Sequence, residues 1–189
     1  MTVRVENLCK SYGGVPVLKD VSFAAGRGVT CIMAPSGAGK TTLLRILLGL
    51  EKPDSGSVSL PASCRAAAVF QENRLLEHLN AAGNLRFVLG SAYDEVQAKA
   101  LLERLGLEET EKCVREWSGG MKRRLALARA LLAPSQALAL DEPFTGLDPE
   151  NREICLRLIA EAAREKPVLL VTHEESDAAA LHAAVIRLS

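Results

Sequence analysis

Residues 34–42 decide the fold of this chain, and they read Ala34-Pro35-Ser36-Gly37-Ala38-Gly39-Lys40-Thr41-Thr42. The stretch follows an apolar run over 29–33, which predicts a short buried strand of a parallel sheet. It precedes residues 43–50, whose apolar side chains predict a helix covered by other structure. A glycine-rich turn between such a strand and such a helix is typical of a phosphate-binding loop.

The residue types in this loop fit that chemistry. Gly37 and Gly39 allow the backbone to turn its N–H groups inward around phosphate oxygens. The helix that starts near Lys40 presents its positive dipole end to the same anions. Lys40 is predicted to reach the β- and γ-phosphates of a nucleotide, and the Thr41 hydroxyl to bind Mg²⁺.

One residue departs from the strict form of the loop pattern, which has glycine where this chain has Ala34. Alanine fits there if the position keeps a negative φ, so we expect little or no strain and no loss of binding. The alternative is a chance glycine-rich turn that carries a surface lysine. The flanking strand and helix favour the phosphate loop.

An apolar stretch over 137–140 ends in two carboxylates, Asp141 and Glu142. Ligands gather at the carboxyl ends of strands in open α/β sheets. Asp141 is predicted to hold the Mg²⁺ shell through water. Glu142 is predicted to polarise the attacking water as general base. Taken alone, the pair is also compatible with a solvated strand end.

A second apolar stretch, over 168–171, ends in Thr172 and His173. A neutral imidazole at this point can donate a hydrogen bond to a γ-phosphate and steady the water. A lone histidine at a strand end is often a bystander, and it is the occurrence of the whole set in order that favours a functional role.

The rest of the chain predicts an α/β fold. Strands are expected over 2–8 and 16–23 around a Gly13-Gly14 turn, and over 66–70 after a turn at Pro53-Asp54-Ser55-Gly56. Residues 72–116 have helical character, with a helix over 94–107 that Ser91-x-x-Asp94 caps and Gly106 ends. The remaining elements are a helix from Ser118 to about 133, strands over 137–140, 168–171 and 185–188, and helices over 150–164 and 174–181.

Composition excludes several classes of protein. The 189 residues are 48% hydrophobic and 24% charged, which is ordinary for one globular domain, and the formal net charge is zero. Nothing in that balance favours nucleic acid as a partner. The uncharged run over 28–39 is too short to span a membrane, and early charges argue against a signal peptide. The five cysteines are far apart and predict structural thiols rather than zinc ligands or disulfides.

With these residues in place, the chain resembles the ATP-binding subunit of an ABC transporter over nearly its whole length. Ser118-Gly119-Gly120-Met121-Lys122-Arg123-Arg124 resembles the family signature, although Met121 replaces the usual glutamine. Four further motifs match, namely Ser11-Tyr12-Gly13-Gly14, Phe70-Gln71-Glu72, Thr145-Gly146-Leu147-Asp148 and Thr172-His173-Glu174. The wording of the motifs is most similar to importers of nitrate, sulfonate, taurine and related anions.

The resemblance implies further site residues. Tyr12 stacks on adenine, and Gln71 lies near Mg²⁺ and the water. It also implies one domain over 1–189, a P-loop NTPase core over 1–71 and 134–189 with an N-terminal antiparallel β subdomain, and an inserted helical subdomain over about 72–133. Ser118, Gly119, Gly120 and Asp148 then contact ATP bound to a second copy or paralogue of the chain.

In such a head-to-tail dimer, two ATP molecules are sandwiched between Lys40 of one chain and Ser118 of the other. ATP binding closes the dimer and hydrolysis reopens it. The implied partners are transmembrane permease subunits that dock near the glutamine loop, over about 72–85, and a solute-binding protein in the case of an importer. We expect a cytoplasmic protein, peripheral on the inner face of the membrane.

Two other functions stay open at this point. One is an ABC ATPase of DNA repair or chromosome structure, but the interval between Gln71 and Ser118 has no heptad run to supply a coiled coil. The other is a regulatory or scaffold domain that uses ATP only for dimerisation, which the presence of Glu142 and His173 argues against. Lys122-Arg123-Arg124 is better explained as a helix face than as a nucleic-acid patch.

Overall fold

Two sheets of different type frame the molecule. The computed structural model describes residues 2–35, 37–59, 65–107 and 111–188. The larger sheet is parallel, in the order β5 (Ala66–Val69), β6 (Ala137–Asp141), β7 (Pro167–Val171), β3 (Gly28–Met33) and β8 (Ala184–Arg187). The smaller sheet is antiparallel, in the order β2 (Val15–Ala25), β1 (Val3–Tyr12) and β4 (Ser55–Ser59). The predicted α/β class, with an antiparallel β subdomain, is confirmed.

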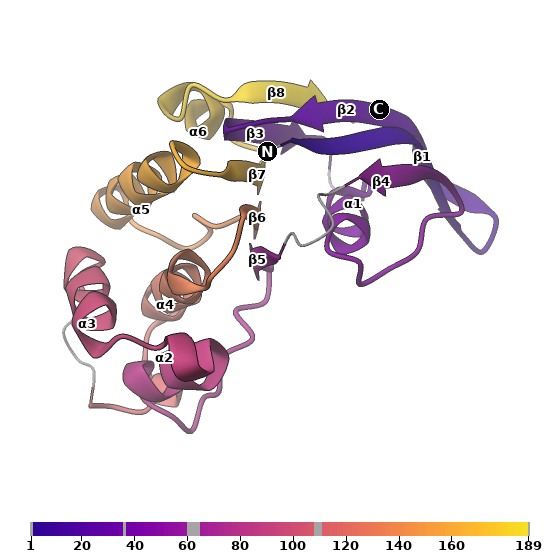
Figure 1. Ribbon diagram of the computed structural model, residues 1–189. Helices are drawn as coiled ribbons and strands as arrows, with labels where there is room; N and C mark the ends of the chain where they lie inside the picture. The colour runs from indigo at the N-terminus through magenta and orange to yellow at the C-terminus, as the bar shows by residue number, and fades with distance from the viewer. Residues whose placement is uncertain (1, 36, 60–64, 108–110, 189) are drawn as a thin grey trace.

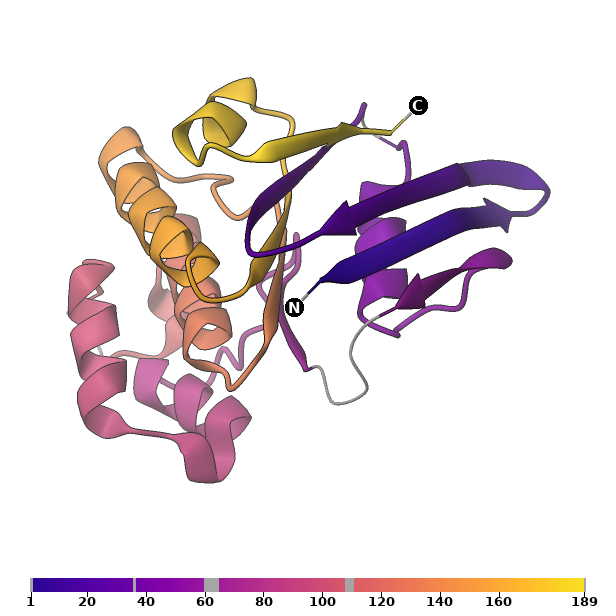
Figure 2. The same ribbon diagram turned by 45° about the horizontal axis from the view of Figure 1, so that its top comes forward.

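Helices cover both faces of the parallel sheet. On one face lie α1 (Lys40–Leu47) and the antiparallel strands, and on the other lie α4 (Gly119–Leu132), α5 (Pro149–Ala163) and α6 (Glu175–Ala180), as Figures 1 and 2 show. Helices α2 (Ala81–Leu89) and α3 (Glu95–Arg104) pack against α4 and one another. Short 3₁₀ turns form over Gly90–Ala92 and Val114–Glu116.

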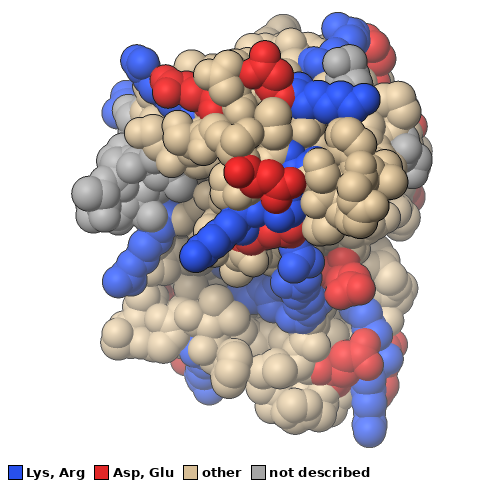
Figure 3. All heavy atoms as spheres, turned by 90° about the vertical axis from the view of Figure 1, so that its right-hand side faces the viewer, with Lys and Arg blue, Asp and Glu red and all other residues tan. Residues whose placement is uncertain are grey.

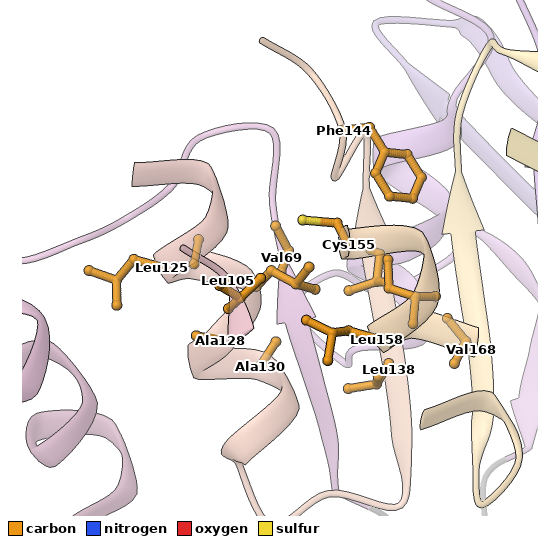
Figure 4. Packing of buried hydrophobic residues seen from close by; sticks show 14 of the residues in the cluster. Val69, Leu105, Leu125, Ala128, Ala130, Leu138, Phe144, Cys155, Leu158 and Val168 are labelled. Atoms are coloured by element: carbon orange, nitrogen blue, oxygen red, sulfur yellow. The ribbon is translucent and has the colours of Figure 1, made fainter. Parts of the chain in front are cut away.

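The central strands divide their side chains between two cores because successive residues of a strand point to opposite faces. In β6, Leu138 and Leu140 enter the core under α4 and α5, whereas Ala139 enters the core around α1. The same alternation places Leu170 of β7 in the first core and Leu169 in the second. Figure 4 shows side chains of α4, α5, β5 and β6 gathered in the first core.

The antiparallel sheet is larger than the sequence predicts. Strands β1 and β2 run several residues beyond the expected ranges and meet at Gly13 and Gly14, both at positive φ. Strand β4 was not expected at all, since only a turn was predicted there. Its sequence, Ser-Gly-Ser-Val-Ser, carries almost no apolar signal, and backbone pairing with β1 holds it in place.

Two helix boundaries differ from the prediction. Helix α1 ends at Leu47 and not at residue 50, because Gly49 adopts a left-handed φ of 69°. The Gly49 and Leu50 N–H groups then donate to the Ile46 and Arg45 carbonyls, which is a Schellman termination. At α3 the N-cap is Asp94 and not Ser91, since the Asp94 carboxylate accepts from the amides of Val96 and Gln97.

Helix α3 ends at Arg104, three residues before the expected end, and the other expected helices and strands are present with ends that move by one or two residues. Gly106, at a φ of 63°, follows α3 as predicted, and Ser118 caps α4. Among the helices of the described ranges, none combines the length and apolarity needed to cross a membrane.

Candidate active site

Strand register brings the predicted functional residues to one edge of the parallel sheet. Asp141 at the end of β6 is aligned with Val171 at the end of β7, and Val171 is aligned with Ile32 of β3. The loops that follow these strands therefore leave the sheet side by side. They carry the predicted phosphate loop, Glu142 and His173, and Gln71 follows the neighbouring strand β5.

The loop between β3 and α1 has the backbone that a phosphate cradle needs. Gly37 and Gly39 have φ values of 82° and 83°, and Gly39 is the N-cap of α1. A Cβ at Gly39 would lie 2.8 Å from the side chains of Val17 and Leu18, so only glycine fits between the loop and β2. Ala34 is not among the residues with positive φ, so the backbone condition for alanine at this position is met. Ser36 lies outside the described residues.

Lys40 closes over its own loop. Its ammonium donates to the carbonyl oxygens of Ala34 at 2.6 Å and Pro35 at 3.0 Å. These are neutral acceptors, and phosphate oxygens are stronger partners for an ammonium because both groups carry charge. A phosphate bound in the loop can therefore replace these carbonyls as the hydrogen-bond acceptor of Lys40.

Thr41 and Asp141 form the innermost pair of the site. The Thr41 hydroxyl donates to Asp141 Oδ2 at 2.7 Å, across 100 positions of sequence. Asp141 is only 2% exposed. A hydroxyl and a carboxylate are hard oxygen ligands, and Mg²⁺ takes one or two protein ligands of this kind beside phosphate and water. The chemistry of the pair fits a magnesium ion.

Glu142 and His173 form a second pair beside the first. His173 Nδ1 lies 3.0 and 3.1 Å from the two Glu142 carboxylate oxygens. The Glu142 carboxylate raises the pKa of His173, through the hydrogen bond first and through its charge second. The raised pKa disfavours the neutral imidazole expected from the sequence for as long as the carboxylate remains its partner.

The backbone of Glu142 is unusual. Its φ is 49°, in the left-handed region that a residue with a long side chain seldom occupies. The Glu142 N–H donates to the Val171 carbonyl at 2.9 Å, which fixes one side of the residue to β7. Such strain persists only where neighbours over-determine the conformation.

A buried carboxylate that sequence reasoning missed anchors the histidine loop. Asp177 of α6 is 1% exposed, accepts from the Thr172 hydroxyl at 2.9 Å, and pairs with Arg152 of α5 at 2.5 Å. Thr172 in turn accepts from the Glu174 N–H at 3.1 Å, so the turn around His173 is tied to two helices. A surface-like run of polar residues at 174–177 gives no local signal for this role.

A cavity of about 860 Å³ opens over these groups. It is lined by Tyr12, Val17, Gly37, Gly39, Lys40, Thr41, Thr42, Gln71, Asp141, Glu142, Thr145 and His173. The sequence predicts all of these except Val17 and Thr145. We call this space the phosphate-loop cavity.

Tyr12 stands half exposed at the edge of the phosphate-loop cavity. Its hydroxyl donates to the Glu51 carboxylate, which raises the pKa of the phenol. Lys10 lies 5.4 Å from the centre of the ring. The aromatic face is thus held in a fixed orientation and remains accessible.

A second cavity, of about 480 Å³, surrounds the start of α4. Its lining includes Ser118, Gly119, Gly120, Gln71, Thr145 and Asp148. The Ser118 hydroxyl accepts from the Met121 N–H at 3.2 Å, and Asp148 caps α5 by accepting from the Asn151 N–H at 2.9 Å. Met121 is therefore compatible with the motif, because its backbone amide makes the capping bond. We call this space the signature cavity.

The two cavities meet but do not merge. Gln71 and Thr145 line both of them. Within the described ranges, neither Lys40 nor Thr41 lines the signature cavity, and none of residues 118–120 lines the phosphate-loop cavity. Figure 3 shows basic side chains gathered near the centre of the face turned toward its viewer.

The family profile of the ABC transporters matches residues 18–145, from β2 to just beyond the acidic pair. The chain belongs to the ABC transporter family. It is an ATP-binding subunit of that family and an ATPase, and both conclusions agree with the cradle and the acidic groups described above.

Relatives of this ABC subunit are ATP-binding proteins. It is 42% identical to the thiamine import ATP-binding protein ThiQ of Mesorhizobium japonicum, and the alignment covers 93% of this chain and 76% of the relative. It is also 42% identical to the aliphatic sulfonates import ATP-binding protein SsuB 1 of Agrobacterium fabrum, covering 93% and 66%. Across these and similar curated relatives, the chain spans 48% to 76% of their length.

A solved structure of a bacterial ABC transporter cassette, described as dimeric, has the same fold. The two chains superpose with a TM-score of 0.87 at 28% identity, over 98% of this chain and 94% of that one.

Proposed function

We propose that this ABC subunit hydrolyses ATP in its phosphate-loop cavity as part of a dimer, and that the cycle drives uptake of a small solute through membrane-spanning partners. The observation that carries the proposal is the separation of the two cavities. Lysine, acid and histidine line one of them, while the signature turn and its amide donors line the other.

The residues of the phosphate-loop cavity divide the work of hydrolysis. Lys40 and the amides of 37–42 bind the phosphates, and the half-exposed ring of Tyr12 stacks on adenine. Glu142 takes a proton from the attacking water while the oxygen of that water bonds to the γ-phosphorus. The bond from that phosphorus to the bridging β–γ oxygen breaks. The products are ADP and inorganic phosphate. His173 orients the Glu142 carboxylate and the water.

Magnesium fits the innermost pair. Thr41 and Asp141 would hold the ion, with Gln71 beside it, and when bound it supplies positive charge that offsets the charge of the phosphates. The 2.7 Å hydrogen bond from the Thr41 hydroxyl to the Asp141 carboxylate holds both oxygen ligands at the wall of the phosphate-loop cavity.

A second copy completes the site. The signature cavity offers a serine hydroxyl and the N-terminal amides of α4, which favour anions, and neither Glu142 nor His173 lines it. A second chain placed head to tail brings its Ser118, Gly119, Gly120 and Asp148 over the ATP of the first. The dimeric cassette with the same fold supports this arrangement. ATP then favours the closed dimer to the extent that it binds that state more tightly.

The names of the relatives support the transport role. Two of them are named import ATP-binding proteins, one for thiamine and one for aliphatic sulfonates. We therefore assign to this chain membrane-spanning permease subunits as partners, a solute-binding protein that delivers the solute, and a position on the inner face of the membrane. The motif wording favours a small anion such as a sulfonate as the solute. The segment over 72–85, next to the glutamine loop, is the proposed docking region.

The decisive experiment compares the wild-type chain with Glu142→Gln. We expect the wild type to release phosphate from Mg²⁺-ATP, and the variant to bind ATP, elute as a dimer in its presence and release phosphate at least about 100-fold more slowly. Wild-type turnover in the variant would remove Glu142 from the role of base. A variant that binds ATP but stays monomeric would contradict the shared site.

A further inference from the structure

Arg123 of α4 joins two loops of the active site that are far apart in sequence. Its guanidinium donates from Nη1 to the carbonyls of Phe70 at 2.6 Å and Gln71 at 3.3 Å. From Nη2 it donates to the carbonyl of Glu142 at 2.6 Å, and it also donates to the carbonyl of Asp141. One planar group thus bridges the glutamine loop and the acidic pair.

The Arg123 side chain is buried, so its hydrogen bonds belong to the interior of the protein and not to its surface. Arg123 is 3% exposed. A buried guanidinium is costly unless its donors are satisfied, and here backbone carbonyls and Asn73 Oδ1, at 3.0 Å, accept from Nη1 and Nη2. Nε is buried without a partner among the described residues, so the two terminal nitrogens alone hold the side chain. Only the fixed fork of arginine can serve two carbonyl groups on each side at once.

The bridge also explains the strained backbone of Glu142. That residue has a φ of 49°, its N–H is bound to Val171, and its carbonyl is bound to Arg123. The same carbonyl accepts from the Thr145 N–H at 3.2 Å. Arg123 therefore contributes to the conformation that aims the Glu142 carboxylate at His173.

Arg123 lies on the same helix as the signature turn. Ser118 is the N-cap of α4, and Arg123 follows five residues later, about 7.5 Å along the axis. A shift of α4 that brings Ser118 toward the ATP of a second chain would move the carbonyls of Gln71 and Glu142 through this one side chain.

We propose that Arg123 is the positioning residue that ties the signature helix to the glutamine loop and to Glu142, so that engagement of the signature turn sets the geometry of the hydrolytic centre. The inference rests on the proposed function. It names a role that Arg123 has within this chain, apart from any contact with nucleotide.

The test compares Arg123→Met and Arg123→Lys with a matched control, Arg129→Met. Arg129 lies on the same helix and donates to the carbonyls of Arg74 at 2.7 Å and Asn73 at 3.0 Å, but to neither Gln71 nor Glu142. The measured quantities are the affinity for an ATP analogue and the rate of phosphate release at saturating ATP. Amide exchange is followed in the same proteins by mass spectrometry.

Arg123→Met is expected to lower the rate of phosphate release about 10- to 100-fold while changing ATP affinity less than about threefold, because misplacement of a reacting group affects rate more than binding. Arg123→Lys keeps the charge without the fork and should fall between Met and the wild type. Arg129→Met should keep the wild-type rate. The proposal would be overturned if Arg123→Met kept the wild-type rate of phosphate release. It would also be overturned if Arg129→Met lost as much of that rate as Arg123→Met.

Amide exchange separates this inference from the proposed function. Arg123→Met and Arg123→Lys should lose protection at Glu142 and Thr145, whereas Arg129→Met should keep it. This readout stands even if the wild type releases no phosphate, a result that would contradict the proposed function alone. If the methionine variant does not fold, the lysine variant decides, and unchanged protection in it would overturn the inference.

Discussion

The phosphate-loop cavity and the signature cavity lie side by side in one chain, yet they are built from different chemistry. In the first, the reactive groups are already paired with one another, Thr41 with Asp141 and Glu142 with His173. In the second, the serine and aspartate serve as helix caps. In the proposed function, the first cavity hydrolyses the phosphate bond and the second only binds the nucleotide of a second chain.

The difference is the reason for proposing that two copies share each site. A water attack needs a base, a cradle and stabilisation of charge on the far side of the phosphates. One chain offers the base and the cradle in one cavity and the far-side donors in another. In the proposed head-to-tail dimer, two copies unite them.

The largest effect is expected from Lys40→Ala. Removing the ammonium eliminates charge-assisted hydrogen bonds worth about 1.5–3 kcal/mol, so the affinity for ATP should fall about 10- to 150-fold in a titration with a fluorescent analogue. Lys122→Ala is the control, because that ammonium pairs with Glu77 at 2.8 Å and not with the cradle. Equal affinity in the two variants would refute the cradle.

Mixing two damaged chains tests whether the cavities act across a dimer. Ser118→Asp keeps an N-cap but places a negative charge against the phosphates, and Lys40→Ala damages the cradle. Each variant alone should be nearly inactive. An equal mixture should recover about a quarter of the wild-type phosphate release, since half of the dimers are mixed and each carries one intact site. No recovery on mixing would mean that both residues act within one chain.

Tyr12 sharpens the description of the first cavity. Tyr12→Ala removes the ring and should weaken ATP binding by about 1 kcal/mol, or roughly fivefold. Tyr12→Phe loses only the hydroxyl that donates to Glu51, and should bind ATP like the wild type. If the phenylalanine variant loses as much affinity as the alanine variant, the hydroxyl matters and stacking does not.

The smallest effect is a titration in the nucleotide-free chain. Because Glu142 raises the pKa of His173, the imidazole should lose its proton at a higher pH than an ordinary histidine, and Glu142→Gln should bring the pKa back down. The pairing stabilises the fold at pH values below about 6.5 and is lost as the pH rises through the raised pKa. Proton NMR of the ring follows both, and an unchanged pKa in Glu142→Gln would show that the pair does not form in solution.

Much of this molecule could be predicted from local sequence. Glycines at 37 and 39 before Lys40 indicate a phosphate loop, because few other functions need that backbone next to an ammonium. The strands ending in Asp141 and Val171 were predicted from apolar runs, and their shared edge follows from parallel pairing. The signature helix begins at its serine cap as expected.

What the sequence alone determined is the type of each functional group and the strand or helix end that presents it. Local patterns carry that information because each depends on only a few neighbouring residues. The tertiary structure alone decided which groups meet, including Arg123 with Glu142, Asp177 with Thr172, and β4 with β1. These contacts join distant segments through buried polar groups and backbone pairing, and neither leaves a periodic trace along the chain.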